Sequence, residues 1–74
     1  MKYTIGVHNN LEEIRIDNNY SRSELADCAG TTEETIEQIE LGAFVPPLML
    51  CMVISKILDV YVEDIWELKK VCFS

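Results

Sequence analysis

Carboxylates dominate the reactive side chains of this sequence, and six of them crowd into residues 21–43 beside a single base, Arg22. The acids are Glu24, Asp27, Glu33, Glu34, Glu37 and Glu40. Six acids and one base give this stretch a charge of −5, and seven acids and five bases give the remainder −2. Carboxylates at this density attract basic proteins and repel nucleic acids and anionic membranes. The chemistry predicted for this stretch is therefore recognition of a cationic partner.

Catalysis and metal binding are not indicated. The three cysteines, Cys28, Cys51 and Cys72, form no CxxC pair, and His8 is the single histidine. A disulfide framework or a zinc site needs paired thiols or several imidazoles. No nucleophile and base pair and no glycine-rich phosphate loop is visible. We expect reduced thiols, no metal, no cofactor and no enzymatic activity.

The length and composition predict one small domain over residues 1–74, because a chain this short has room for a single core. The N-terminus lacks the long apolar segment of a signal peptide. The uncharged run over residues 41–54 is too short and too broken by proline to span a bilayer. A cytoplasmic protein is expected.

Apolar spacing predicts a short strand followed by helices. Tyr3, Ile5 and Val7 alternate with other residues, which is typical of a strand over residues 3–7. A first helix is expected over about residues 10–18, where apolar residues recur at helical spacing.

Two brief helices follow, joined by a turn. Ser21 and Glu24 have the spacing of a capping box that opens the second helix, and Gly30 suits its left-handed end. Either of the two threonines after Gly30 can cap a third helix that ends near Glu40. Residues 21–42 thus have the arrangement of a helix-turn-helix motif.

The C-terminal third is also predicted to be helical. Two consecutive prolines suit the first turn of a fourth helix that ends at Leu58. A fifth helix is expected over residues 62–69, with Trp66 toward the core. The tail at residues 70–74 is expected either to pair as a strand with residues 3–7 or to lie on a partner.

A set of residues at fixed spacing runs through these elements. It comprises Leu11, Ile14, Arg15, Ser21, Glu24-Leu25-Ala26, Gly30, Thr32, Thr35-Ile36, Gln38-Ile39-Glu40, Gly42, Pro46, Leu48, Ile54, Leu58-Val60 and Asp64-Ile65-Trp66. Over residues 10–68 this pattern resembles the Cro/CI-type (XRE-like) family of helix-turn-helix repressors, which includes the lambdoid phage repressors. The resemblance implies an all-α, compact five-helix domain to which short N- and C-terminal strands can be added.

In that family the third helix enters the major groove and neighbouring residues hold phosphates. The matching positions here are Arg22, Thr32, Glu33, Glu34, Gln38, Leu41 and Ala43, and Glu37 adds to the same acidic face. The family commonly has Gln, Arg or Lys where this chain has Glu33 and Glu34, whose carboxylates cannot donate to adenine or guanine. At the positions of Leu41 and Ala43, members of that family often have Asn or Lys, which bind phosphate. The affinity for operator DNA is therefore expected to be reduced.

Two other interpretations of these positions stay open. Acids in the first turn of a helix are stabilised by the helix dipole by about 0.3–1 kcal/mol each, whatever they face. A glutamate can also accept a hydrogen bond from cytosine N4. The resemblance further implies that Arg15 and Glu40 form a structural ion pair between the first and third helices.

The fourth helix is apolar nearly all round, which predicts burial on two sides. The residues expected to face the core are Leu48, Met52, Ile54 and Leu58. The residues expected to form an oligomer or partner interface are Met49, Leu50, Val53 and Ile57. Coverage of this second side by the terminal strands is the alternative.

Two functions are compatible with the sequence. The first is a transcriptional regulator of phage or bacterial type that acts through proteins, as an antirepressor, a co-regulator or a DNA-mimicking decoy. Its partner would be a regulatory protein such as a basic helix-turn-helix repressor. The second is a homodimeric transcription factor that reads operator DNA directly through its third helix.

Overall fold

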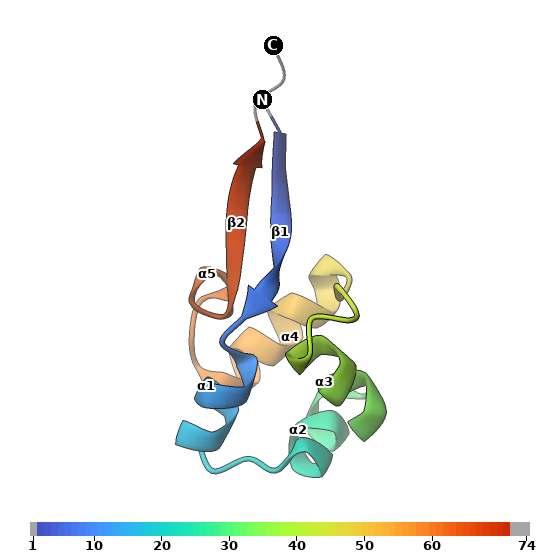
Figure 1. The fold of residues 1–74 in the computed structure, drawn as a ribbon. Helices are drawn as coiled ribbons and strands as arrows, with labels where there is room; N and C mark the ends of the chain where they lie inside the picture. The colour runs from blue at the N-terminus through green and yellow to red at the C-terminus, as the bar shows by residue number, and fades with distance from the viewer. Residues whose placement is uncertain (1, 72–74) are drawn as a thin grey trace.

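The computed structural model describes the backbone of residues 2–71 and the side chains of residues 9–66. Over this part of the chain, a two-stranded ribbon projects from a body of five helices (Figure 1). The helices are α1 (Leu11–Asp17), α2 (Arg22–Ala29), α3 (Glu33–Glu40), α4 (Leu48–Leu58) and α5 (Val62–Ile65). The strands are β1 (Lys2–Asn9) and β2 (Trp66–Val71). The mostly helical helix-turn-helix fold is confirmed, and both terminal strands are present.

The ribbon joins the two ends of the described chain. β1 and β2 pair antiparallel, with Ile5 opposite Leu68 and Asn9 opposite Trp66, and the register is irregular between Ile5 and Asn9. Pairing of the C-terminal segment with the N-terminal strand, one of the two outcomes expected for it, is thus confirmed. Residues 72–74 of the predicted tail lie outside the described residues.

The prediction that the fifth helix reaches residue 69 is wrong. α5 ends at Ile65, and Trp66 has extended backbone angles of φ −113° and ψ 127°. The backbone N–H of Asn10 donates to the carbonyl of Ile65 over 2.9 Å, and β1 pairs with the residues that follow. Apolar residues at positions 66 and 68 fit the period of a strand as well as that of a helix, so spacing alone did not separate the two.

The local chemistry of the sequence sets the ends of α2 and α3. The hydroxyl of Ser21 accepts from the backbone N–H of Glu24 over 3.0 Å, and the Glu24 carboxylate accepts from the N–H of Ser21 over 3.0 Å. Gly30 ends α2 with φ 71°, which a residue with a Cβ adopts at a cost. Thr32 caps α3 by accepting from the N–H of Thr35 over 3.2 Å. These caps satisfy backbone donors that the helices leave unpaired.

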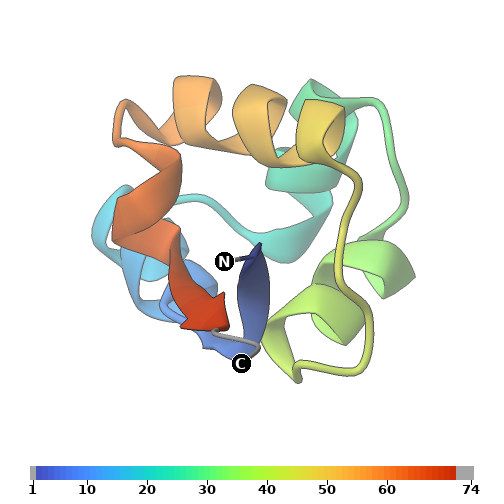
Figure 2. The same cartoon turned by 90° about the horizontal axis from the view of Figure 1, so that it is seen from above.

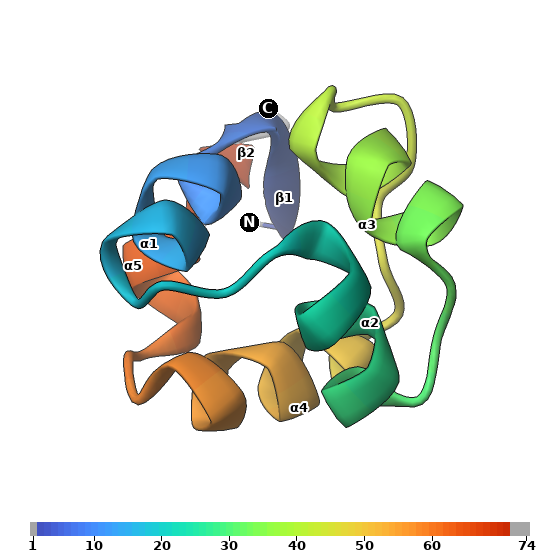
Figure 3. The same cartoon turned by 90° about the horizontal axis from the view of Figure 1, so that it is seen from below.

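The described helices surround one apolar core. Figures 2 and 3 view the molecule along the ribbon, and the helices ring the base of the ribbon in both. The core comprises Leu11, Leu25, Ala26, Ile36, Ile39, Cys51, Ile54, Leu58, Ile65 and Trp66. Ala26 is 2% exposed, and its small side chain fits the close packing of α2 with its neighbours.

α4 is rotated relative to the expectation. Its buried residues are Cys51, Ile54, Ser55 and Leu58, which recur at i, i+3, i+4 and i+7. Leu48 and Met52 are 65% and 51% exposed, so their predicted core positions are wrong. A thiol and a hydroxyl take the buried places instead, and the Ser55 hydroxyl donates to the carbonyl of Met52 over 2.9 Å. No helix in the described part of the chain, α4 included, is long and apolar enough to cross a membrane.

Candidate functional site

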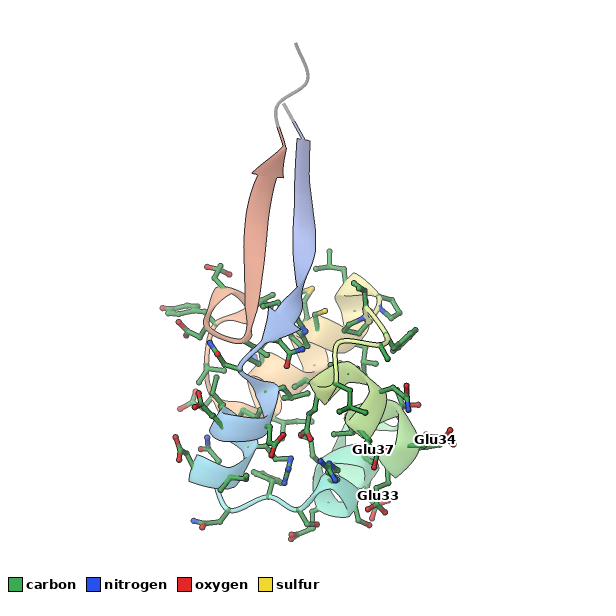
Figure 4. The ribbon with its side chains drawn as sticks, in the orientation of Figure 1. Glu33, Glu34 and Glu37 are labelled. Atoms are coloured by element: carbon green, nitrogen blue, oxygen red, sulfur yellow. The ribbon has the colours of Figure 1, made fainter. Side chains whose placement is uncertain are left out.

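The outward face of α3 presents three carboxylates. Glu33, Glu34 and Glu37 are all exposed. In Figure 4 they lie at the lower right of the helical body, away from the ribbon. Glu33 and Glu34 lie in the first turn, where the helix dipole stabilises a negative charge. The dipole accounts less well for Glu37, which lies a turn further along.

Arg22, the single base of the motif, is paired with two of the motif's acids. Its Nε donates to Oε1 of Glu40 over 2.8 Å, and its Nη1 lies 3.8 Å from Oε2 of Glu37. The hydrogen bond and the charge of Glu40 raise the pKa of the Arg22 guanidinium. The single base of the motif is therefore engaged by acids of the same motif. This pairing joins residues 18 positions apart, and sequence spacing gave no sign of it.

Arg15 binds the other side of the same carboxylate. Its Nε donates to Oε2 of Glu40 over 2.6 Å, and its Nη1 donates to the carbonyl of Tyr20 over 2.9 Å. The side chain of Glu40 is 0% exposed and that of Arg15 is 9% exposed. Two guanidinium groups thus share one buried carboxylate, so Glu40 contributes structure and not surface charge.

Thr32 and Gln38 are partly committed to the fold. The hydroxyl of Thr32 lies 2.8 Å from that of Thr35 and also caps α3, although Thr32 is exposed. The backbone carbonyl of Gln38 accepts from the N–H of Ala43 over 2.9 Å, while its side chain is half-buried. Both side chains keep polar atoms within reach of a ligand on the α3 face.

The end of α3 continues into an exposed apolar loop. Leu41 is 69% exposed, and Phe44 and Val45 are 42% and 47% exposed. Ala43 is exposed as well. In place of cations or amides, this loop exposes hydrocarbon to solvent.

A groove lies between α3 and the start of α4. One wall is polar and the other is apolar, and the volume between them is about 450 Å³. Its lining residues are Thr31, Glu34, Thr35, Gln38, Phe44, Pro47 and Leu50. Sequence analysis placed Glu34 and Gln38 on one functional face and Leu50 on another, and missed that the fold brings them together. The sequence feature that could have indicated the groove is the apolar run at residues 43–45, which follows the motif directly.

The four residues expected at an α4 interface are not equivalent. Met49 is 72% exposed, whereas Leu50, Val53 and Ile57 are half-buried. Leu50 and Ile57 pack against the core from its edge. The freely exposed apolar side chains of α4 are instead Leu48, Met49 and Met52. The outer face of α4 is therefore apolar, but it is shifted around the helix.

No cofactor or metal site is evident in the described region. Within it, no group of three or more His, Cys, Asp or Glu side chains could hold a metal ion. Cys28 is exposed, and Cys51 is buried with its thiol 3.6 Å from the carbonyl of Pro46. Burial raises the pKa of the Cys51 thiol.

Two short helices joined by a capped turn, with the second helix presenting its outer side to solvent, define a helix-turn-helix protein. No protein-family model matches the chain. An uncharacterised HTH-type transcriptional regulator, YgzD of Bacillus subtilis (strain 168), is 34% identical over 62 residues, which are 84% of this chain and 94% of that protein. The chain therefore belongs to the HTH-type transcriptional regulators.

Proposed function

We propose that this protein is a Cro/CI-type regulator whose α3 face binds a basic protein instead of operator DNA. The observation that carries the proposal is the charge of that face. Glu33, Glu34 and Glu37 are exposed, and Arg22 is engaged by Glu40 and Glu37. A cationic surface meeting this face gains three carboxylates, and among the described ion pairs only Glu37 already has a base beside it, Arg22 at 3.8 Å.

The same charges oppose DNA. A carboxylate held 6–8 Å from a phosphate at an effective dielectric near 20 is repelled by about 2 kcal/mol before salt screening. Each lost bidentate base contact removes about 1–3 kcal/mol more. Two such positions bring the loss into the range of about 4–10 kcal/mol that separates specific from non-specific DNA binding. The α3 face is consequently better matched to a protein than to an operator.

The partner proposed is a regulatory protein with a basic surface, for instance a helix-turn-helix repressor. The α3 carboxylates would occupy the arginines and lysines that such a repressor uses on phosphates, so the protein would act as an antirepressor or decoy. Both proteins would meet in the cytoplasm. The apolar face of α4 provides a second surface, either for the same partner or for a homodimer.

A second candidate, direct operator binding as a dimer, is favoured by two observations. The scaffold keeps its caps and turn, and the relative YgzD is described as an HTH-type transcriptional regulator. Under this alternative Glu33 and Glu34 would accept from cytosine N4, while Thr32 and Gln38 would make the remaining contacts.

Selection from a library of random DNA duplexes separates the two candidates. The protein is immobilised, and DNA is retained and sequenced at about 150 mM salt, where surface electrostatics is screened as in the cell. The proposal predicts no enriched sequence. Under the alternative an enriched sequence emerges, and Glu33→Gln with Glu34→Gln changes it while Gln38→Ala abolishes it.

A further inference from the structure

The groove between α3 and the start of α4 combines two chemistries that separate elements supply. From α3, Glu34, Thr35 and Gln38 form one wall. From the loop and α4, Phe44 and Leu50 form the other. Phe44 is 42% exposed, which for a large aromatic side chain leaves hydrocarbon in contact with water. Hydrocarbon exposed beside a carboxylate favours a ligand that is itself apolar and cationic.

Further apolar side chains are exposed close to the groove in sequence. Val45 and Leu48, which are 47% and 65% exposed, lie in the same stretch of chain as Phe44. An open groove with an apolar wall can receive one anchor from the apolar face of an amphipathic helix, whose anchors recur every three or four residues.

The charge around the groove selects the sign of the partner. Glu34 borders the groove, and Glu33 and Glu37 lie on the same helix. Among the described residues, the ion pairs of the motif involve Glu40 and Glu37, and none involves Glu34. A second copy of this chain would bring the acids of its own α3 face toward these three, which disfavours it as the occupant.

We propose that the groove receives an apolar side chain from a basic amphipathic helix of a partner protein, and that a lysine or arginine one turn away pairs with Glu34. This inference rests on the proposed function, since it names how the basic partner is held. The apolar anchor supplies affinity and the flanking cations supply orientation. Exclusion of water from the groove would strengthen the ion pair at Glu34.

The test is a titration of the full chain, labelled with ¹⁵N, with a designed helical peptide. Leucines spaced three and four residues apart line one face of the peptide, and lysines and arginines line the other. A matched peptide has serine at every leucine position. We expect amide shifts at Glu34, Thr35, Gln38, Phe44 and Leu50, and binding about tenfold weaker with the serine peptide.

Two pairs of variants locate the contacts. Glu34→Gln should weaken binding of the leucine peptide about threefold and make its affinity less dependent on salt concentration. Glu13→Gln, which removes an exposed acid from α1, should change neither the affinity nor its salt dependence. Phe44→Ser should weaken binding about tenfold, whereas Ile16→Ser, which removes an exposed apolar side chain of α1 outside the groove, should leave it unchanged. The amide spectrum of each variant reports whether the fold is retained.

Three results would overturn the inference: equal binding of the two peptides, shifts at Glu33 and Glu37 without shifts at Phe44 and Leu50, or equal losses in the matched variants. Each of these leaves the proposed function standing, because a basic partner could still bind the acidic face elsewhere. An enriched DNA sequence in the library selection, by contrast, refutes the proposed function whatever the peptides do.

Discussion

The Nε atom of Arg22 donates a hydrogen bond to Oε1 of Glu40 over 2.8 Å, so the only base of the helix-turn-helix motif is held by an acid of that motif. Arg15 donates to the other oxygen of the same carboxylate. The result is a network that ties α1, α2 and α3 together around a side chain that is 0% exposed. It also holds the one base of the motif against Glu40 and Glu37, so Arg22 pairs with neither Glu33 nor Glu34 among the described ion pairs.

Removal of the shared carboxylate of Glu40 should lower the stability of the fold. Glu40→Ala leaves two guanidinium groups without their partner, one of them nearly buried, and we expect a loss of about 3 kcal/mol in the free energy of unfolding. Arg22→Ala removes a side chain that is 34% exposed and should lower the free energy of unfolding by clearly less. Urea unfolding measures both values. Equal losses for the two variants would contradict the central place given to Glu40.

The capping box of α2 should make stability depend on pH in a predictable direction. Hydrogen bonds from the backbone N–H and the side chain of Ser21 hold the pKa of Glu24 below its usual value. A lowered folded-state pKa contributes stability that is present above the unfolded pKa and is lost as the pH falls through the folded one. Glu24→Gln should therefore be less stable than the parent at neutral pH, and the gap should close from about pH 5 downward. A gap that stays constant in urea unfolding between neutral and acidic pH would count against this.

The two cysteines in the described region should react at very different rates. Cys28 is exposed on α2, whereas Cys51 is 0% exposed and burial raises the pKa of its thiol. In a Cys72→Ser background, a thiol reagent should modify one group rapidly and the second only as the protein unfolds. Mass spectrometry of the modified peptides identifies the sites. Rapid modification of Cys51 under native conditions would show that the core is open at α4.

The exposed apolar face of α4 should mediate self-association if the protein forms a homodimer. Met49→Asp places a charge in the middle of that face, and Met49 is 72% exposed, so the fold should tolerate it. Ile16→Asp is the matched control, because Ile16 is an exposed apolar residue on α1. Light scattering should give half the parent mass for Met49→Asp and the parent mass for Ile16→Asp. An identical mass for all three proteins would remove α4 from the interface.

Local patterns predicted the local features of this fold well. Ser21, Gly30 and Thr32 each act through backbone groups no more than four residues away. Ser21 and Thr32 begin a helix and Gly30 ends one, as their types indicate. The change from helix α5 to strand β2 at Trp66 was not predicted, because β2 pairs with β1 from the other end of the chain. Short apolar runs do not distinguish such a strand from a helix.

The candidate site was predictable only in part. The acidic face depends on residues that are close in sequence within α3, and their exposure follows from the helical period. The engagement of Arg22 and the meeting of Glu34 with Phe44 depend on how separate elements pack, and no spacing encodes it. Which side of α4 faces the core also depends on how separate elements pack. Cys51 and Ser55 are buried there, where larger apolar side chains of α4 were expected.

The negative charge of the α3 face can be largely neutralised without touching the core. Glu33→Gln, Glu34→Gln, Leu41→Asn and Ala43→Lys all change exposed residues, remove two negative charges and add one positive charge. None of the four side chains belongs to the network around Glu40. The combined variant should therefore keep the fold while regaining the donors that DNA recognition needs.

The most direct measurement is the affinity of this variant and of the parent for a pool of random DNA duplexes, by fluorescence anisotropy at about 150 mM salt. We expect the parent to show no binding at micromolar concentration and the variant to bind at least about tenfold more tightly than the parent, which corresponds to about 1.4 kcal/mol. Nanomolar binding by the parent, with no gain in the variant, would contradict the claim that the charge of α3 turns this helix-turn-helix protein away from DNA.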